Sequence, residues 1–194
     1  RETAARLIAK CRVCLDRIRD GLNFLKRNEE VSRQALKAFK LANHAMYIVQ
    51  LRNKLGKRRR SYNQTDLRYE WDINCPEIDM LTEVKERGYW RPFQIAFLLQ
   101  TIRGICEPSD ESRNIVDLIW FPTGGGKTEA YLALTAFTIF FHRISGQQVS
   151  GADVLMRYTL RLLTTQQFER AGLLFCSMEY VRLLNEQQLG TLPF

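Results

Sequence analysis

The chain has 194 residues, 45% of them hydrophobic and 26% charged, which is enough apolar content for a buried core and excludes a disordered chain. Its net charge of +8 lies at the N-terminal end: residues 1–70 hold 18 Lys and Arg against 7 Asp and Glu, whereas residues 71–194 hold 11 against 14. This asymmetry predicts a surface that faces a polyanion, nucleic acid more readily than membrane, although a solvated basic helix surface is the plain alternative.

The five cysteines follow no disulfide spacing, and no apolar run reaches the ~18 residues of a membrane span. We therefore expect a cytoplasmic protein with reduced thiols and no membrane partner. Cys11 and Cys14 form a C-x-x-C pair, but no second pair of ligands completes a zinc site. Because both follow the helical spacing of their apolar neighbours, they are expected on a buried helix face.

Residues 1–60 are predicted to form a basic helical hairpin. Apolar side chains recur at helical spacing in residues 2–27 and again in residues 31–56. Asn28 and the two glutamates that follow it suit the start of the second helix. The hairpin ends in the basic run Lys57–Arg60, which either contacts phosphate groups or lies in a solvated loop.

Residues 61–90 are predicted to form an irregular linker, because they mix Trp, Tyr, Pro and acidic residues without a helical or strand period. Trp71 and Trp90 are expected to anchor this linker by packing. A helix should begin at Pro92, since proline suits the first position of a helix.

The rest of the chain alternates strand and helix patterns. The apolar run 115–121 has the β-branched content of a strand buried on both faces, and a second short run covers 154–158. Helices are predicted from Lys127 to His142 and over residues 165–188. Strand, glycine loop, helix, strand and helix is the order of a parallel sheet, so the expected fold class is α/β.

A glycine-rich phosphate loop is the strongest signal in the chain. Its residues are Phe121-Pro122-Thr123-Gly124-Gly125-Gly126-Lys127-Thr128. Successive glycines let backbone N–H groups approach phosphate oxygens, and the helix that follows directs its positive end at the same anion. The loop predicts ATP and Mg²⁺ as cofactors, with Lys127 neutralising phosphate charge and Thr128 binding the metal, and these two residues are the catalytic candidates.

The P-T-G-x-G-K-T loop and the upstream phrase Trp90-Arg91-Pro92-Phe93-Gln94 resemble superfamily 2 helicases, although Phe121 replaces the usual Ala or Gly. The resemblance implies that Gln94 reads the adenine edge, and an amide suits this task because it donates and accepts at once. A glutamine at an exposed helix start is the alternative. The expected ATP-binding residues are Arg91, Gln94, Thr123, Gly124, Gly125, Gly126, Lys127, Thr128 and Glu129.

The segment 157–167 lies where superfamily 2 helicases have a motif that touches the nucleic-acid backbone, although Tyr158 replaces the usual proline. Hydroxyl, amide and arginine side chains suit phosphate contacts. The resemblance implies nucleic-acid-binding roles for Arg157, Tyr158, Thr159, Arg161, Thr164, Thr165 and Gln167.

The phrases AFKLANHAM, YWRPFQIAFLL, WFPTGGGKTEAYLAL and ADVLMRYTLRLLTTQQFERA together resemble the large helicase subunit of the DISARM anti-phage system, over residues 35–180. The resemblance implies that residues 91–194 are the N-terminal part of a RecA-like P-loop ATPase lobe, and that the second RecA-like lobe lies elsewhere. It also implies DNA and a phospholipase D-like subunit as partners.

No D-E-x-H-like tetrad follows the loop, so the segment alone should bind nucleotide weakly and hydrolyse it poorly. A nucleotide-gated assembly module is the alternative function: it would capture a protein partner through residues 1–60 without translocation. A P-loop kinase fits less well, because kinases lack the Pro-Thr-Gly sequence before the glycines.

Overall fold

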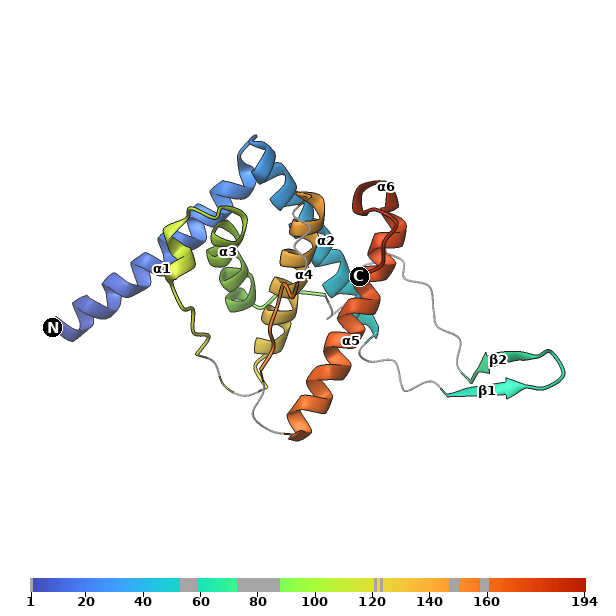
Figure 1. Ribbon diagram of the computed structural model, residues 1–194. Helices are drawn as coiled ribbons and strands as arrows, with labels where there is room; N and C mark the ends of the chain where they lie inside the picture. Colours follow the sequence, from blue (N-terminus) through green and yellow to red (C-terminus); the bar gives the residue numbers. More distant parts are fainter. Residues whose placement is uncertain are drawn as a thin grey trace.

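The computed structural model describes residues 2–52, 59–72, 88–120, 122, 124–146, 151–157 and 161–194, with the backbone alone for residues 161–164. In chain order its elements (Figure 1) are α1 (Glu2–Lys26), α2 (Glu30–Arg52), β1 (Arg60–Asn63), β2 (Arg68–Trp71), α3 (Pro92–Cys106), the 3₁₀ helix η1 (Glu111–Asn114), α4 (Lys127–Ile144), α5 (Arg161–Leu184) and α6 (Glu186–Leu189). None of the described helices combines the length and the apolar character that a membrane crossing requires.

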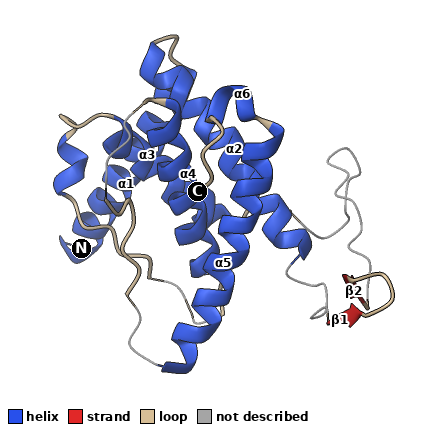
Figure 2. Ribbon diagram, turned by 45° about the vertical axis from the view of Figure 1, so that its right-hand side comes forward, coloured by secondary structure: helices blue, strands red, loops and turns tan. Residues whose placement is uncertain are grey.

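The predicted α/β fold is wrong, because the described residues contain no parallel sheet. Helices hold 69% of them, and their strands β1 and β2 form a two-stranded antiparallel hairpin (Figure 2). The runs predicted as strands lie in no described helix or strand over residues 115–120 and 154–157, and the last residue of each run lies outside the described part. The RecA-like arrangement expected for residues 91–194 is therefore not observed.

The physical reason for this error lies in what surrounds the first run. A strand buried on both faces needs a neighbour along each edge and a layer over each face. Instead, the side chains of Val116, Leu118 and Trp120 are 94%, 80% and 90% exposed. The β-branched and apolar content of the run favours an extended backbone, but the described residues do not bury it.

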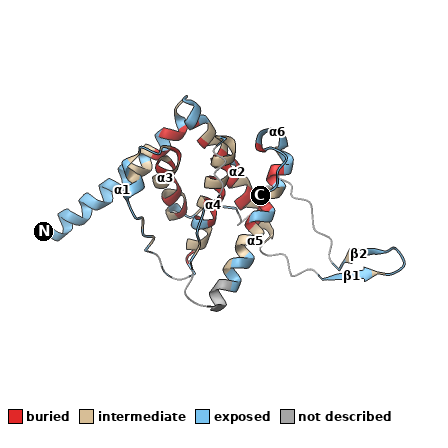
Figure 3. Cartoon of the chain, in the orientation of Figure 1, coloured by how far each residue is buried: buried red, intermediate tan, exposed pale blue. Residues whose placement is uncertain are grey.

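The helices predicted over residues 2–27 and 31–56 are observed as α1 and α2, although residues 53–56 lie outside the described part. They diverge from the turn that joins them (Figure 1): α1 packs mainly against α3, and α2 packs mainly against α4 and α5. The first half of α1 is exposed (Figure 3). Cys11 and Cys14 are therefore exposed, and the expectation that they lie on a buried face is wrong.

The core is centred on α2 and α4, and buried residues of α1, α3, α5 and α6 continue the same cluster. Small residues of α2 allow α4 to approach closely, namely Ala35, Ala38, Ala42 and Ala45. Phenylalanines of α4 fill the interface, namely Phe137, Phe140 and Phe141, and each contributes roughly 1.5–3 kcal/mol on burial. Leu174, Met178 and Val181 of α5 are buried, whereas Phe168 and Leu184 of the same helix are 78% and 59% exposed.

Part of the predicted linker is regular, because β1 and β2 pair within it. Trp71 ends β2 and is half exposed, and its role as a packing anchor stays a prediction. Trp90 fits the prediction: it packs against the core, and its indole N–H donates to Asn43 Oδ1 at 2.6 Å. Residues 73–87 of the linker lie outside the described part.

Gly21→Ala is expected to destabilise the fold, because a Cβ at this position in α1 would lie 1.7 Å from the carbonyl oxygen of Leu99 in α3. The two helices would have to separate at their crossing, at a cost of roughly 2–3 kcal/mol in the free energy of unfolding, measured by urea denaturation. Gly172→Ala in α5 is the matched control: nothing lies within 4 Å of its Cβ, so the better helix propensity of alanine should stabilise by up to ~1 kcal/mol. Equal effects of the two substitutions would contradict the close crossing.

Thiol reactivity should separate the described cysteines into two groups. Burial raises the pKa of the Cys106 thiol, so little thiolate exists there at pH 8, and Cys106 is also shielded from solvent. We expect iodoacetamide to modify Cys11, Cys14 and Cys176 in the native protein and Cys106 only after unfolding. Peptide mass spectrometry measures this order, and early modification of Cys106 would argue against its place in the core.

Candidate functional site

The glycine loop lies at the N-terminus of α4. Gly124 and Gly126 have φ angles of 79° and 87°, in the left-handed region that favours glycine. Gly126 directly precedes the helix, and no side chain caps the first turn. The N–H groups of that turn can therefore bind an anionic ligand. Phe121 and Thr123 lie outside the described residues.

Arg91 and Gln94 hold the loop from one side. Arg91 Nη1 donates to the carbonyl oxygen of Gly125, and Gln94 Nε2 donates to that of Gly126, each at 2.7 Å. A Cβ at Gly126 would lie 2.7 Å from Gln94 Nε2, so this approach requires glycine. In a trans peptide the N–H points opposite to the C=O. The N–H groups of Gly126 and Lys127 therefore point away from the two side chains.

The start of α3 fixes these two side chains. The backbone N–H of Gln94 donates to the backbone carbonyl Arg91 O at 2.9 Å, and Gln94 Oε1 accepts from the backbone N–H of Arg91 at 2.8 Å, which is the Gln half of a capping box. Pro92 stands in the first turn, as predicted. Gln94 is 4% exposed, and its amide retains one N–H and one lone pair after these bonds. The observed hydrogen bonds of the Gln94 side chain are thus with backbone atoms, and its remaining N–H and lone pair can bind a ligand.

Lys127 and Thr128 stand on the first turn of α4. Lys127 Nζ donates to the carbonyl oxygen of Pro122 at 3.4 Å, so the ammonium group lies across the loop. Thr128 is half-buried. The neighbouring Glu129 pairs with Arg170 of α5 through one carboxylate oxygen, and its other oxygen is buried without a hydrogen-bond partner. Hydroxyl and carboxylate oxygens are ligands that Mg²⁺ accepts, so Thr128 and Glu129 each carry a suitable ligand atom.

The segment of residues 115–120, which leads to the loop, is tied to α1. Arg17 donates to both oxygens of Asp117, at 2.5 and 2.8 Å, in a bidentate pair. The hydrogen bond from this side chain to Asp117 raises the pKa of the Arg17 guanidinium. Arg17 Nη2 also donates to Gln100 O at 3.2 Å, so one side chain joins α1, α3 and the approach to the loop.

The residues predicted to bind nucleic acid are only partly described. Arg157 and Thr165 are exposed, and Gln167 is half-buried with its Oε1 atom unbonded. Tyr158 and Thr159 lie outside the described residues, and Arg161 and Thr164 are described by their helical backbone alone.

Arg170 was not predicted, and it links this region to the loop through its pair with Glu129. Its position three residues after Gln167, on the same face of α5, is the sequence signal that could have found it.

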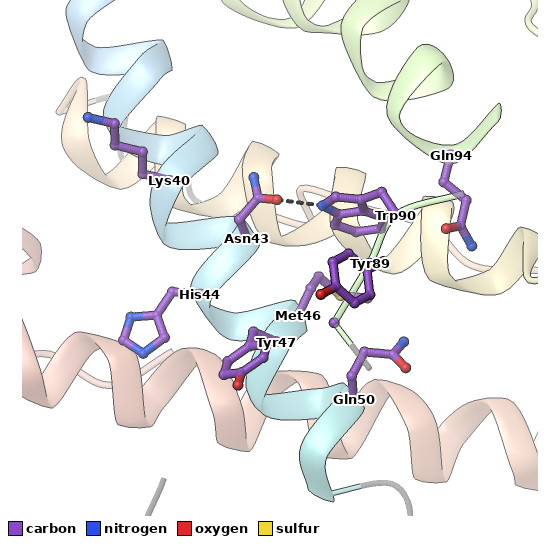
Figure 4. A pocket seen from close by; sticks show the side chains of 10 residues that line it. Lys40, Asn43, His44, Met46, Tyr47, Gln50, Tyr89, Trp90 and Gln94 are labelled. Carbon is purple, nitrogen blue, oxygen red and sulfur yellow. Dashed lines mark hydrogen bonds between the residues drawn. The ribbon is translucent and has the colours of Figure 1, made fainter. Parts of the chain in front are cut away.

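A cavity of about 430 Å³ lies between α2 and the chain leading into α3 (Figure 4). Aromatic and amide side chains line it, including His44, Tyr47, Gln50, Tyr89, Trp90 and Gln94. Burial lowers the pKa of the His44 imidazole, so the ring is neutral at pH 7. Aromatic rings and amides are groups that hold a nucleobase. Gln94 belongs both to this cavity and to the contact with the loop.

Comparison with known proteins identifies one relative. The chain is 39% identical to DISARM protein DrmA of Bacillus paralicheniformis (strain ATCC 9945a / NCIMB 11709 / CD-2) over 188 residues. The match covers 94% of this chain and 15% of the relative, so the chain corresponds to a small segment of that protein. Neither a protein-family model nor a solved structure matches the chain. The chain is therefore related to a segment of a DISARM protein.

Gln94→Ala is expected to weaken the affinity of the chain for a fluorescent ATP analogue about tenfold, which corresponds to roughly 1.4 kcal/mol. The substitution removes the hydrogen bond to Gly126 O and the cap on the backbone N–H of Arg91. Gln100→Ala, a half-buried glutamine on the same helix, should leave the affinity unchanged. Fluorescence titration measures both affinities. Equal affinities for the parent, Gln94→Ala and Gln100→Ala would show that Gln94 does not contribute to nucleotide binding.

Proposed function

We propose that the chain, as a relative of a segment of DISARM protein DrmA, is the ATP-binding front segment of a DNA-dependent motor in anti-phage defence. The observation that carries this proposal is the uncapped N-terminus of α4 behind a glycine loop whose carbonyls are held by Arg91 and Gln94. A loop whose carbonyls are turned to one side presents its N–H groups on the other side, where phosphate oxygens can be bound.

Each residue of the loop has a role in this proposal. The N–H groups of Gly126 and Lys127 bind phosphate oxygens, and the Lys127 ammonium adds a positive charge. Thr128 binds Mg²⁺, which neutralises phosphate charge, and the unbonded oxygen of Glu129 lies in the same turn. The base occupies the cavity next to Gln94, whose remaining N–H and lone pair match an adenine edge.

The nucleic-acid contact is proposed for the segment 157–167, at the start of α5. The pair between Glu129 and Arg170 supports a link between the two sites, because it joins the first turn of α4 to the helix that carries Thr165 and Gln167. The carboxylates for hydrolysis, the second lobe of the motor and a phospholipase D-like partner subunit would come from outside this chain. The chain spans 15% of its relative, which leaves room for the first two elsewhere in such a protein.

ATP turnover by the full-length protein, with and without single- and double-stranded DNA, tests this function. We expect DNA to stimulate turnover, and Lys127→Ala to reduce it roughly 10²-fold, because the variant loses a charge that stabilises the transition state. Lys10→Ala, on the exposed part of α1, is the matched control and should retain activity. An ATP turnover rate that DNA does not change would contradict the motor proposal.

A nucleotide-gated assembly module is the second candidate, and an exposed stripe on α1 favours it. Apolar side chains recur there at alternating intervals of four and three, namely Ala4, Ile8, Cys11, Leu15, Ile18 and Leu22, and all but the half-buried Ile18 are exposed. Arg12, Arg19 and Lys26 flank the stripe at seven-residue intervals, which suits a partner helix with acidic flanks. This candidate would be supported if the parent chain bound a protein partner in the absence of DNA and the Leu15→Asp variant did not.

A further inference from the structure

The β1–β2 hairpin has two chemically different faces. Its register pairs Arg60 with Trp71 and Tyr62 with Tyr69. Residues directly opposite one another lie on the same face, and so do residues two apart along a strand. These four residues therefore share one face, which we call the aromatic face. The residues of the other face are Ser61, Asn63, Arg68 and Glu70.

The polar face and the open end of the hairpin are stabilised by contacts within the hairpin. Asn63 Nδ2 donates to Glu70 Oε1 at 2.9 Å, and the Arg68 guanidinium lies 3.7 Å from the same oxygen. At the open end, the backbone N–H of Arg59 donates to Asp72 Oδ1 at 2.8 Å, and the N–H of Asp72 donates to Arg59 O at 3.0 Å. The acids of this region are thus engaged away from the aromatic face.

The aromatic face is open to solvent. Tyr62 is 50% exposed and Tyr69 is 59% exposed, with ring centroids 5.1 Å apart and planes tilted by 60°. The Arg60 guanidinium lies 4.7 Å from the centre of the Tyr69 ring. The hairpin stands apart from the helices (Figure 1), and no described helix packs against it. An exposed aromatic surface of this kind is typical of binding sites.

Charge indicates the kind of ligand. Residues 52–60 hold six basic residues and no acidic one, and they lead directly into β1. Arg60 is the charged member of the aromatic face. A ligand that suits both features is polyanionic and offers flat rings. Single-stranded nucleic acid has this chemistry, because its phosphates are charged and its unpaired bases can stack on tyrosine and arginine. A duplex offers the same phosphates but keeps its bases stacked on one another.

We propose that the aromatic face of the β1–β2 hairpin binds single-stranded nucleic acid. Unpaired bases stack on Tyr62 and Tyr69 beside Arg60, and phosphates lie against Arg59 and Arg60. This surface is separate from the contact proposed at residues 157–167, and its binding requires no nucleotide at the glycine loop.

The test measures the affinity of the full-length protein for a fluorescent oligothymidylate, without ATP, by anisotropy. Tyr62→Ala and Tyr69→Ala should each weaken binding about tenfold through the loss of stacking, whereas Tyr62→Phe and Tyr69→Phe should bind as the parent does. The parent should bind a blunt duplex of equal length more weakly, and the alanine variants should leave that affinity unchanged. Retention by the phenylalanine variants separates loss of stacking from loss of the hairpin fold.

Arg60→Gln and Arg68→Gln form a matched pair that removes the same charge from opposite faces. A lower oligonucleotide affinity in Arg60→Gln together with an unchanged affinity in Arg68→Gln supports the aromatic face. Equal losses of affinity in both variants would mean that the charge acts without regard to the face, and would overturn the proposal. Photocrosslinking of a bromodeoxyuridine oligonucleotide should label the hairpin peptide. Unchanged affinity in the alanine variants, or a crosslink found only elsewhere, overturns the proposal too.

Because ATP is absent, these results do not depend on the proposed motor. If Lys127→Ala leaves DNA-stimulated turnover unchanged, the motor proposal fails. The hairpin proposal is then still decided by the oligonucleotide affinity of the Tyr62 and Tyr69 variants.

Discussion

The functional argument for this chain depends on two hydrogen bonds, from Arg91 to Gly125 and from Gln94 to Gly126. Through these two bonds the start of α3 holds the glycine loop in place. Both donors stand at the start of α3, and α3 is itself fixed by its close crossing with α1 and by Arg103, which binds Asp20 of α1 at 2.7 Å. A loop of three glycines has large conformational entropy when free. Rigid helices that hold its carbonyls reduce that entropy before any ligand arrives.

A second set of contacts extends from the loop in the opposite direction. Glu129, in the first turn of α4, binds Arg170 of α5, and α5 begins in the segment proposed to touch nucleic acid. The loop is therefore connected on one side to the cavity beside α2 and on the other side to α5. A ligand that draws the Glu129 carboxylate toward a cation would compete with Arg170 for it, since one carboxylate then serves two positive charges. This gives the two proposed sites a physical means of communication, through one side chain rather than through a general movement of the fold.

Sequence patterns predicted the helices well, because helical spacing and the proline at the start of α3 are local signals. They failed for residues 115–120, since whether an extended run joins a sheet depends on partners that its own composition does not specify. The β1–β2 hairpin was missed because its turn lacks a glycine signal and instead places Leu67 at a φ of 52°. The adenine-reading role of Gln94 stays a prediction, and spacing alone could not show that its amide binds the backbone carbonyl of Gly126. Arg170 was missed because its partner lies 41 residues away in the sequence.

The extended approach to the loop has a consequence for handling the chain. Val116, Leu118 and Trp120 alternate with the half-buried Asp117 and Ile119, so three exposed apolar side chains follow one another at every second position of a backbone that joins no described ladder. Such a stretch is a template for edge-to-edge association between copies, and this hazard grows with concentration. The 194-residue chain should therefore precipitate more readily than its net charge of +8 suggests. A charged side chain at position 118 would act as a gatekeeper there without touching the glycine loop.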